Sequence, residues 1–150
     1  MSDQTKVDVS QQAYAAFGHG DIPALLSFLS EDVEWSLPGP SVIPWAGTRH
    51  GHEGVAEFFS LVGETLEFEQ FEAREFVGQG DPVVLGYQRS FLKPTGRMLE
   101  QEWVHVYALR NGKIAMGRFF EDTAAQVVAL APPEFGSFWA FAAFEFPRSP

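Results

Sequence analysis

The chain has 150 residues, 45% of them hydrophobic, which is enough for one domain to bury most of its apolar surface without covalent or metal staples. Its 20 acidic and 10 basic residues give a formal net charge of -10, which opposes binding to nucleic acid or to an anionic membrane surface. Cysteine is absent, which excludes disulfides and thiolate metal sites. The opening MSDQTKVDVSQQ lacks the basic and apolar segments of a signal peptide, so the expected compartment is the cytoplasm.

The first part of the chain is predicted to be mainly helical. Apolar residues recur at helical spacing over about 6–17, and the glycines of GHGD end that run. A second helix is predicted in DIPALLSFLS, where Asp21 is a suitable cap and Pro23 falls in the first turn. EDVEWSL predicts a short strand, and the Pro/Gly-rich stretch 38–51 predicts a loop without regular structure. A third helix is predicted over about 52–65.

The rest of the chain alternates as antiparallel strands do. LEFEQFEAREFVGQG, PVVLGYQRSFL and RMLEQEWVHVYAL predict three strands, and Asn111-Gly112 predicts a type I′ hairpin leading into a fourth. DTAAQVVALA predicts a closing helix. Helices broken by one strand, then a meander and a last helix, predict an α+β fold with the helices on one face of a curved sheet.

The hairpin at Asn111-Gly112 predicts which side chains share a face. Pairing Arg110 with Lys113 gives three opposed pairs on one face: His105 with Arg118, Trp103 with Phe120, and Gln101 with Asp122. On a flat sheet His105 and Asp122 would then lie about 13 Å apart, too far for a hydrogen bond. A bulge at Gly117 would shift this register and reverse the facing of every residue beyond it.

Three stretches of the chain, EDVEWSLPGP, IPWAGTRHGHEGVAEFF and WVHVYALRNGKIAMGRFFEDTAA, resemble the nuclear-transport-factor-2-like superfamily, in particular its SnoaL-like branch. The resemblance runs from about Val7 to Ala131. It implies a cone-shaped domain in which a bent sheet wraps around helices and leaves a pocket. Members include polyketide cyclases, a ketosteroid isomerase, an epoxide hydrolase, dehydratases and non-catalytic proteins, so the fold alone does not determine the function.

His105 and Asp122 are the candidate catalytic residues. A histidine near its ordinary pKa can exchange protons at neutral pH, and burial beside Trp and Phe would raise the pKa of a carboxyl toward the same range. The resemblance implies the same two positions, because several catalytic relatives carry an acid where this chain has Asp122 and a polar group where it has His105. Two departures argue against close copies: Trp35 replaces the acid of the isomerases, and the hydrolase Arg and Asp are missing beside His105. Structural roles remain open, since Asp122 also suits the N-cap of the last helix.

Further residues are predicted to line the pocket and bind substrate: Tyr14, Trp35, Trp45, Trp103, Arg118 and Phe120. The aromatic members suit core packing equally well. His50 and His52 have the spacing of a metal pair, but a third ligand is missing nearby, so neither a metal nor another cofactor is expected.

Two functions remain open for a chain predicted to form a single domain over residues 1–150. One is a cofactor-independent acid–base enzyme of the polyketide cyclase, isomerase or dehydratase kind, acting on a small hydrophobic molecule. The other is a non-catalytic ligand-binding or assembly domain. The aromatic tail 132–150 contains five Phe and one Trp, and such apolar surface needs cover. A homodimer is therefore predicted, with the tail packed on the sheet, on the partner or over the pocket mouth.

Overall fold

Four helices and six strands follow one another in the computed structural model, which describes residues 1–132. The helices are α1 (Asp3–Gly18), α2 (Ile22–Ser27), α3 (Gly51–Thr65) and α4 (Thr123–Leu130). The strands are β1 (Leu29–Leu37), β2 (Gly47–His50), β3 (Leu66–Val77), β4 (Val83–Leu92), β5 (Met98–Arg110) and β6 (Lys113–Phe120). The predicted aromatic tail beyond residue 132 lies outside the described residues.

The two N-terminal helices begin at side-chain caps. The Ser2 hydroxyl accepts a hydrogen bond from the amide of Thr5, and α1 therefore starts three residues before the predicted 6–17 segment. The Asp21 carboxylate accepts from the amide of Ala24 at 3.1 Å, as predicted for α2, and Pro23 lies in its first turn. These caps fix where the two helices begin.

The six strands form one sheet in the order β2-β1-β6-β5-β4-β3. Every neighbouring pair is antiparallel except β1 and β6, which run parallel. The predicted α+β fold with a curved antiparallel sheet is confirmed, apart from the parallel pairing of β1 with β6, which was not predicted. The predicted loop over 38–51 is wrong in its last part, because Gly47–His50 pairs with β1 as an edge strand. Four residues are too few to produce a readable alternation in the sequence.

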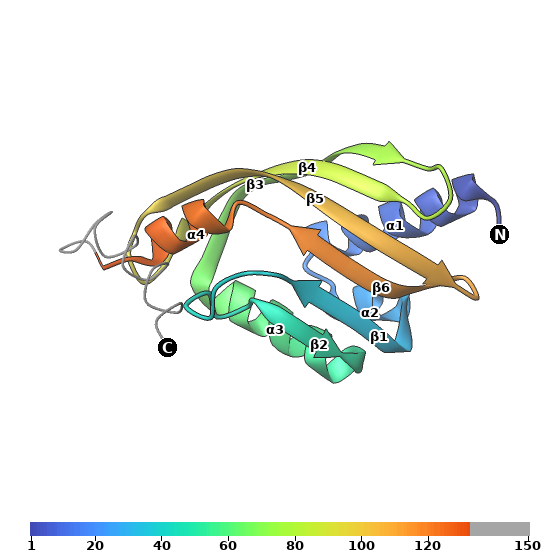
Figure 1. Cartoon of the computed structure of the whole chain (residues 1–150), viewed down its shortest axis with the longest axis horizontal. Coiled ribbons are helices and arrows are strands. Elements are labelled where there is room, and N and C mark those ends of the chain that lie inside the picture. The colour runs from blue at the N-terminus through green and yellow to red at the C-terminus, as the bar shows by residue number, and fades with distance from the viewer. Residues whose placement is uncertain (133–150) are drawn as a thin grey trace, which may run out of the picture.

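Figure 1 shows strands β3 to β6 arching over the helices, with α1, α2 and α3 on the concave side. The inward positions of β4 alternate with outward ones, and Gly86 is an inward position. A Cβ at Gly86 would lie 2.1 Å from the Trp103 ring and 2.4 Å from the Glu72 carbonyl oxygen. Glycine therefore allows Trp103, which is only 2% exposed, to lie directly across β4. No helix within residues 1–132 is long and apolar enough to cross a membrane.

The hairpin between β5 and β6 forms at the predicted turn. Asn111 has φ 53° and Gly112 has φ 79°, as a type I′ turn requires, and Arg110 pairs with Lys113. The predicted register beyond this pair is wrong, because the pairing skips Ala115 between Ile114 and Met116. This bulge, two residues before the suspected Gly117, reverses the facing of the rest of β6.

The bulge changes which residues of β6 face the helices. His105 lies opposite Phe119 rather than Arg118, and Val104 rather than Trp103 lies opposite Phe120. Phe119 is buried at 4% exposure, whereas Phe120 is 45% exposed and Arg118 is also exposed. Arg118 and Phe120 therefore lie on the convex face of the sheet, outside the concave core.

Candidate functional site

A cavity of about 80 Å³ lies between the concave face of the sheet and the helices. Its wall is mostly aromatic and aliphatic, and Trp35 and Trp45 belong to it. Polar side chains also line it: Tyr14, Gln88, His105, Tyr107 and Glu121. We call this space the inner cavity. Its few polar groups on an apolar wall are typical of a site that binds a small molecule in one orientation.

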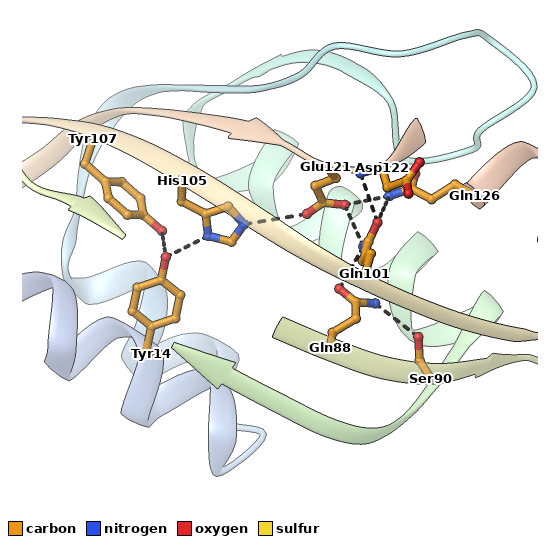
Figure 2. A network of polar contacts seen from close by, with 9 residues as sticks. All are labelled: Tyr14, Gln88, Ser90, Gln101, His105, Tyr107, Glu121, Asp122 and Gln126. Carbon is orange, nitrogen blue, oxygen red and sulfur yellow. Dashed lines mark hydrogen bonds and ion pairs between the residues drawn. The ribbon is translucent and has the colours of Figure 1, made fainter. Parts of the chain in front are cut away.

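His105 faces the inner cavity because side chains alternate between the two faces along β5, which places His105 on the same face as Trp103 and Tyr107. Its ring stacks on Trp103 with the centroids 3.9 Å apart, and meets Phe119 edge-on at 4.6 Å. Its Nδ1 lies 2.6 Å from the Tyr14 hydroxyl, which lies 2.7 Å from the Tyr107 hydroxyl. Figure 2 shows these hydrogen bonds from His105 through Tyr14 to Tyr107, with α1 contributing Tyr14 from the opposite wall.

Glu121 follows β6 directly and points back toward His105. Its Oε2 lies 3.6 Å from His105 Nε2, which is too long for a hydrogen bond. Its Oε1 accepts a hydrogen bond from Gln126 at 2.7 Å and a longer one from Gln101 at 3.4 Å. Within residues 1–132, His105 Nε2 is buried and has no hydrogen-bond partner. The two groups therefore face each other without a direct bond.

Buried amides hold Glu121 in this position, as Figure 2 shows. Gln101 accepts from the Asp122 amide at 3.1 Å and from Gln126 at 3.2 Å, and donates to Gln88 at 3.0 Å. Gln88 in turn donates to Ser90 at 3.0 Å. Because α4 carries Gln126 and the sheet carries Gln88 and Gln101, the network ties the last helix to the sheet at the carboxylate. Among the described residues Gln126 Oε1 is buried without a hydrogen-bond partner, but the bonds that are made restrict these side chains to one arrangement.

Burial determines the charge of the aromatic polar groups. It lowers the pKa of His105, and the nearby Glu121 carboxylate, which acts in the opposite direction, does not outweigh it. The imidazole is therefore neutral at pH 7. Burial also raises the pKa of Tyr14 and of Tyr107, so both phenols keep their protons. A ring lone pair facing the Glu121 carboxylate would be repelled, so we assign the proton to Nε2; Nδ1 then accepts from Tyr14.

The predicted substrate-binding residues have three different placements. Tyr14, Trp35 and Trp45 line the inner cavity, and Trp103 lies behind His105 as its stacking partner. Arg118 and Phe120 lie on the other face of the sheet, because of the bulge at Ala115.

Asp122, predicted as catalytic with His105, has an exposed side chain that caps α4. Its Oδ1 accepts from the Ala125 amide at 2.9 Å, so the alternative N-cap assignment is confirmed. The structure brings Glu121 to His105 instead. The sequence signal for Glu121 was the possible bulge at Gly117, which lies two residues after the actual bulge at Ala115. The inward facing of Tyr107 follows from its spacing of two from His105.

The two histidines considered as a metal pair lie apart from the inner cavity. His52 Nε2 lies 3.0 Å from the Leu29 carbonyl oxygen, and His50 is exposed at the N-cap of α3. In the part of the chain that the structure describes, no group of three or more His, Cys, Asp or Glu side chains could hold a metal ion.

Comparisons with known proteins place the chain in a family. The SnoaL-like domain model matches residues 10–116. An NTF2-like protein from Burkholderia xenovorans LB400 is 36% identical with a TM-score of 0.80, over 87% of this chain and 99% of that one. TerC, crystallised with polyporic acid, is 30% identical with a TM-score of 0.74, over 84% and 98%. The uncharacterized protein Rv0034 of Mycobacterium tuberculosis is 25% identical over 93% and 100% of the two chains. The chain thus belongs to the SnoaL-like domain family of the NTF2-like superfamily.

Proposed function

We propose that this protein catalyses a cofactor-independent proton transfer on a small, uncharged, cyclic molecule, with His105 and Glu121 as the catalytic residues. One observation carries the proposal: buried His105 Nε2 has no hydrogen-bond partner among residues 1–132 and lies 3.6 Å from Glu121 Oε2 at the wall of an apolar cavity. An unpaired buried donor costs about 1–3 kcal/mol, and a ligand oxygen would remove that cost.

The geometry suits a carbonyl compound with an acidic C–H bond beside the carbonyl. The Nε2–H of neutral His105 donates to the carbonyl oxygen, and Glu121 Oε2 takes the proton from the adjacent carbon. The electron pair of the broken C–H bond moves onto the carbonyl oxygen, where the hydrogen bond stabilises the enolate. Return of the proton from Glu121 to a different carbon isomerises the molecule. Attack of the enolate on a second carbonyl of the same molecule closes a ring, and the new alkoxide takes the proton.

Tyr14 positions His105 in this mechanism. By donating to Nδ1 at 2.6 Å, its hydroxyl fixes the tautomer that carries the proton on Nε2. It also polarises the imidazole as the enolate forms. The Tyr107 hydroxyl lies 2.7 Å from the Tyr14 hydroxyl and donates to that oxygen, which strengthens the hydrogen bond from Tyr14 to His105. The arrangement of carboxylate, neutral imidazole and phenols is therefore prepared for negative charge on the ligand before the ligand binds.

The relatives support binding of a small molecule. TerC, which is 30% identical to this chain, was co-crystallised with polyporic acid. We extend small-molecule binding to this chain because Tyr14, His105 and Glu121 form a polar side of an otherwise apolar cavity.

The test measures proton transfer without knowledge of the natural substrate. Cyclic ketones such as 2-tetralone are incubated with the protein in D₂O, and NMR follows exchange of the hydrogens beside the carbonyl. We expect exchange above the buffer rate, lowered by about a hundredfold or more in Glu121→Gln and in His105→Gln. Glu121→Gln keeps an oxygen to accept from Gln126 but cannot take up a proton. Exchange at the buffer rate, or unchanged exchange in both folded variants, would overturn the proposal.

A second candidate is a ligand-binding protein without catalysis. The observation that favours it is the burial of His105, which lowers its pKa, so that at neutral pH the ring is not the imidazolium that would serve as a general acid. In this case His105 and Glu121 only hydrogen-bond the ligand. Binding of phenols with no exchange of any ketone would favour this candidate.

A further inference from the structure

We propose that the groove between α1, α3 and β3 is an outer subsite, which receives an uncharged apolar tail on the ligand whose reacting ring lies in the inner cavity. This inference rests on the proposed function, because it takes the inner cavity as the place of the reacting ring. The groove has a volume of about 790 Å³ and lies along the C-terminal half of α1, the turn into α2, α3 and β3. We call it the outer groove.

The outer groove and the inner cavity share a wall. Tyr14 lines both spaces, as do four phenylalanines from three different elements: Phe17, Phe59, Phe68 and Phe71. We call these four the phenylalanine wall. A residue that lines both spaces has the inner cavity on one side and the outer groove on the other, so the two spaces are separated by a single layer of side chains. A ligand needs to displace only that layer to occupy both.

The phenylalanine wall is built from edge and tilted contacts between half-buried rings. Phe17 lies 4.9 Å from Phe71, 5.5 Å from Phe59 and 5.7 Å from Phe68, measured between centroids. All four are only partly buried, unlike Trp35 and Trp103 on the sheet. A partly buried ring can rotate toward the groove without leaving a void in the core, so the wall can open at low cost.

The two volumes decide how far a ligand extends. The inner cavity holds about 80 Å³, whereas an engineered cavity that binds benzene holds about 150 Å³ and pockets for larger ligands hold about 300–1,000 Å³. Even one ring therefore displaces part of the wall. Any ligand larger than one ring must extend into the outer groove, whose 790 Å³ lies within the usual range.

The chemistry of the outer groove selects the kind of tail. None of the described residues that line it is Lys or Arg, so no side chain there pairs with an anionic tail. The polar residues are Gln11, Gln70 and Glu69, and Glu69 already pairs with Arg89 at 3.0 Å. The remaining lining is aromatic or aliphatic apart from glycine. The Gln70 amide already donates to Glu72, so an alkyl chain or a second ring, with a hydroxyl or carbonyl for Gln11, fits this surface.

Phenols with tails of increasing length test the outer subsite. Calorimetry gives Kd for phenol, 4-ethylphenol and 4-hexylphenol, and NMR signals of the His105 ring report whether the phenol group reaches the inner cavity. We expect affinity to rise by up to about fourfold for each methylene that becomes buried. From 4-ethylphenol to 4-hexylphenol the gain should be at least about tenfold, which allows for a groove that is partly open to solvent.

Two matched variants on α1 separate the groove from general hydrophobic binding. Ala15 is exposed and lines only the outer groove, so Ala15→Trp fills the groove without touching the inner cavity. Gln12 is exposed on the same helix and lines neither space, which makes Gln12→Trp the control. Ala15→Trp should abolish the gain with tail length and leave the Kd for phenol unchanged, whereas Gln12→Trp should match the wild type.

Each outcome has a distinct meaning. The first outcome is that phenol shifts the His105 NMR signals but affinity does not rise with tail length, or rises equally in Ala15→Trp. This outcome overturns the outer subsite and leaves the proposed function standing. Phenols of every length that fail to shift the His105 signals overturn both. A gain present in the wild type and Gln12→Trp but absent in Ala15→Trp supports the subsite.

Discussion

The Tyr14 hydroxyl is the centre of the buried hydrogen bonds that join Tyr107, Tyr14 and His105, and its removal gives a quantitative prediction. It lies 2.6 Å from His105 Nδ1 and 2.7 Å from the Tyr107 hydroxyl. Tyr14→Phe keeps the ring, which stacks on Trp103 at 5.8 Å between centroids with an angle of 15°, and removes only the oxygen. The substitution therefore deletes two hydrogen bonds with little change in packing.

The size of the effect follows from what is left without a partner. Nδ1 and the Tyr107 hydroxyl are both buried, and each unsatisfied group costs about 1–3 kcal/mol, so Tyr14→Phe should lower the free energy of unfolding by about 2–6 kcal/mol. Tyr107→Phe is the matched control. It removes one of the two bonds and leaves Tyr14 donating to His105, so its cost should be only about 1 kcal/mol.

Urea unfolding followed by tryptophan fluorescence measures both variants, with equal m-values as the condition for comparing them. If Tyr107, Tyr14 and His105 are hydrogen-bonded as proposed, Tyr14→Phe should lower the free energy of unfolding by at least about 1 kcal/mol more than Tyr107→Phe does. If Tyr14→Phe costs no more than Tyr107→Phe, the hydroxyl does not hold His105 in the way described.

Three further predictions concern packing, pH and assembly. Gly86→Ala should destabilise the fold by about 1–3 kcal/mol in urea unfolding, because the new methyl would meet the Trp103 ring and the Glu72 carbonyl; a smaller loss would mean that β3 and β4 give way easily. Folding lowers the pKa of His105, so the neutral ring stabilises the fold fully at pH values above the unfolded pKa of about 6.5. As the pH falls below that value this contribution is lost, and the free energy of unfolding decreases by up to about 1.4 kcal/mol per pH unit. His105→Gln should lack this component, and equal slopes in both proteins would refute the assignment. We also predict a homodimer that depends on the tail, so truncation after Pro133 should shift sedimentation toward monomer or aggregate; an unchanged dimer would exclude the tail from the interface.

Local sequence patterns predict much of the fold. The Asn111-Gly112 turn, the alternation that turns His105 inward and the cap at Asp21 are each determined by a few neighbouring residues. The family resemblance supplies the order of helices and strands. The short edge strand Gly47–His50 was not predictable in the same way, because its pairing with β1 is the main reason it is extended.

The candidate site was predicted less well, and the cause is one residue. Gly117 indicates that this strand could contain a bulge, but the sequence does not establish that one forms or that it lies at Ala115. The bulge moves Arg118 to the convex face and brings Glu121 rather than Asp122 to His105. The amide network is also a tertiary feature. Gln126 contacts Glu121 where α4 packs against β5, and that packing is not predicted by a local sequence pattern.

The neighbouring acids at the end of β6 provide the most direct test of the central claim, which is that Glu121 is the base. The measurement is the rate of deuterium exchange into 2-tetralone by Glu121→Gln and by Asp122→Asn, each relative to the wild type. Asn caps helices as well as Asp does, so Asp122→Asn should keep α4 in place and exchange at the wild-type rate. Glu121→Gln should be slower by about a hundredfold or more. A loss confined to Asp122→Asn, or equal rates in the two variants, would contradict the account.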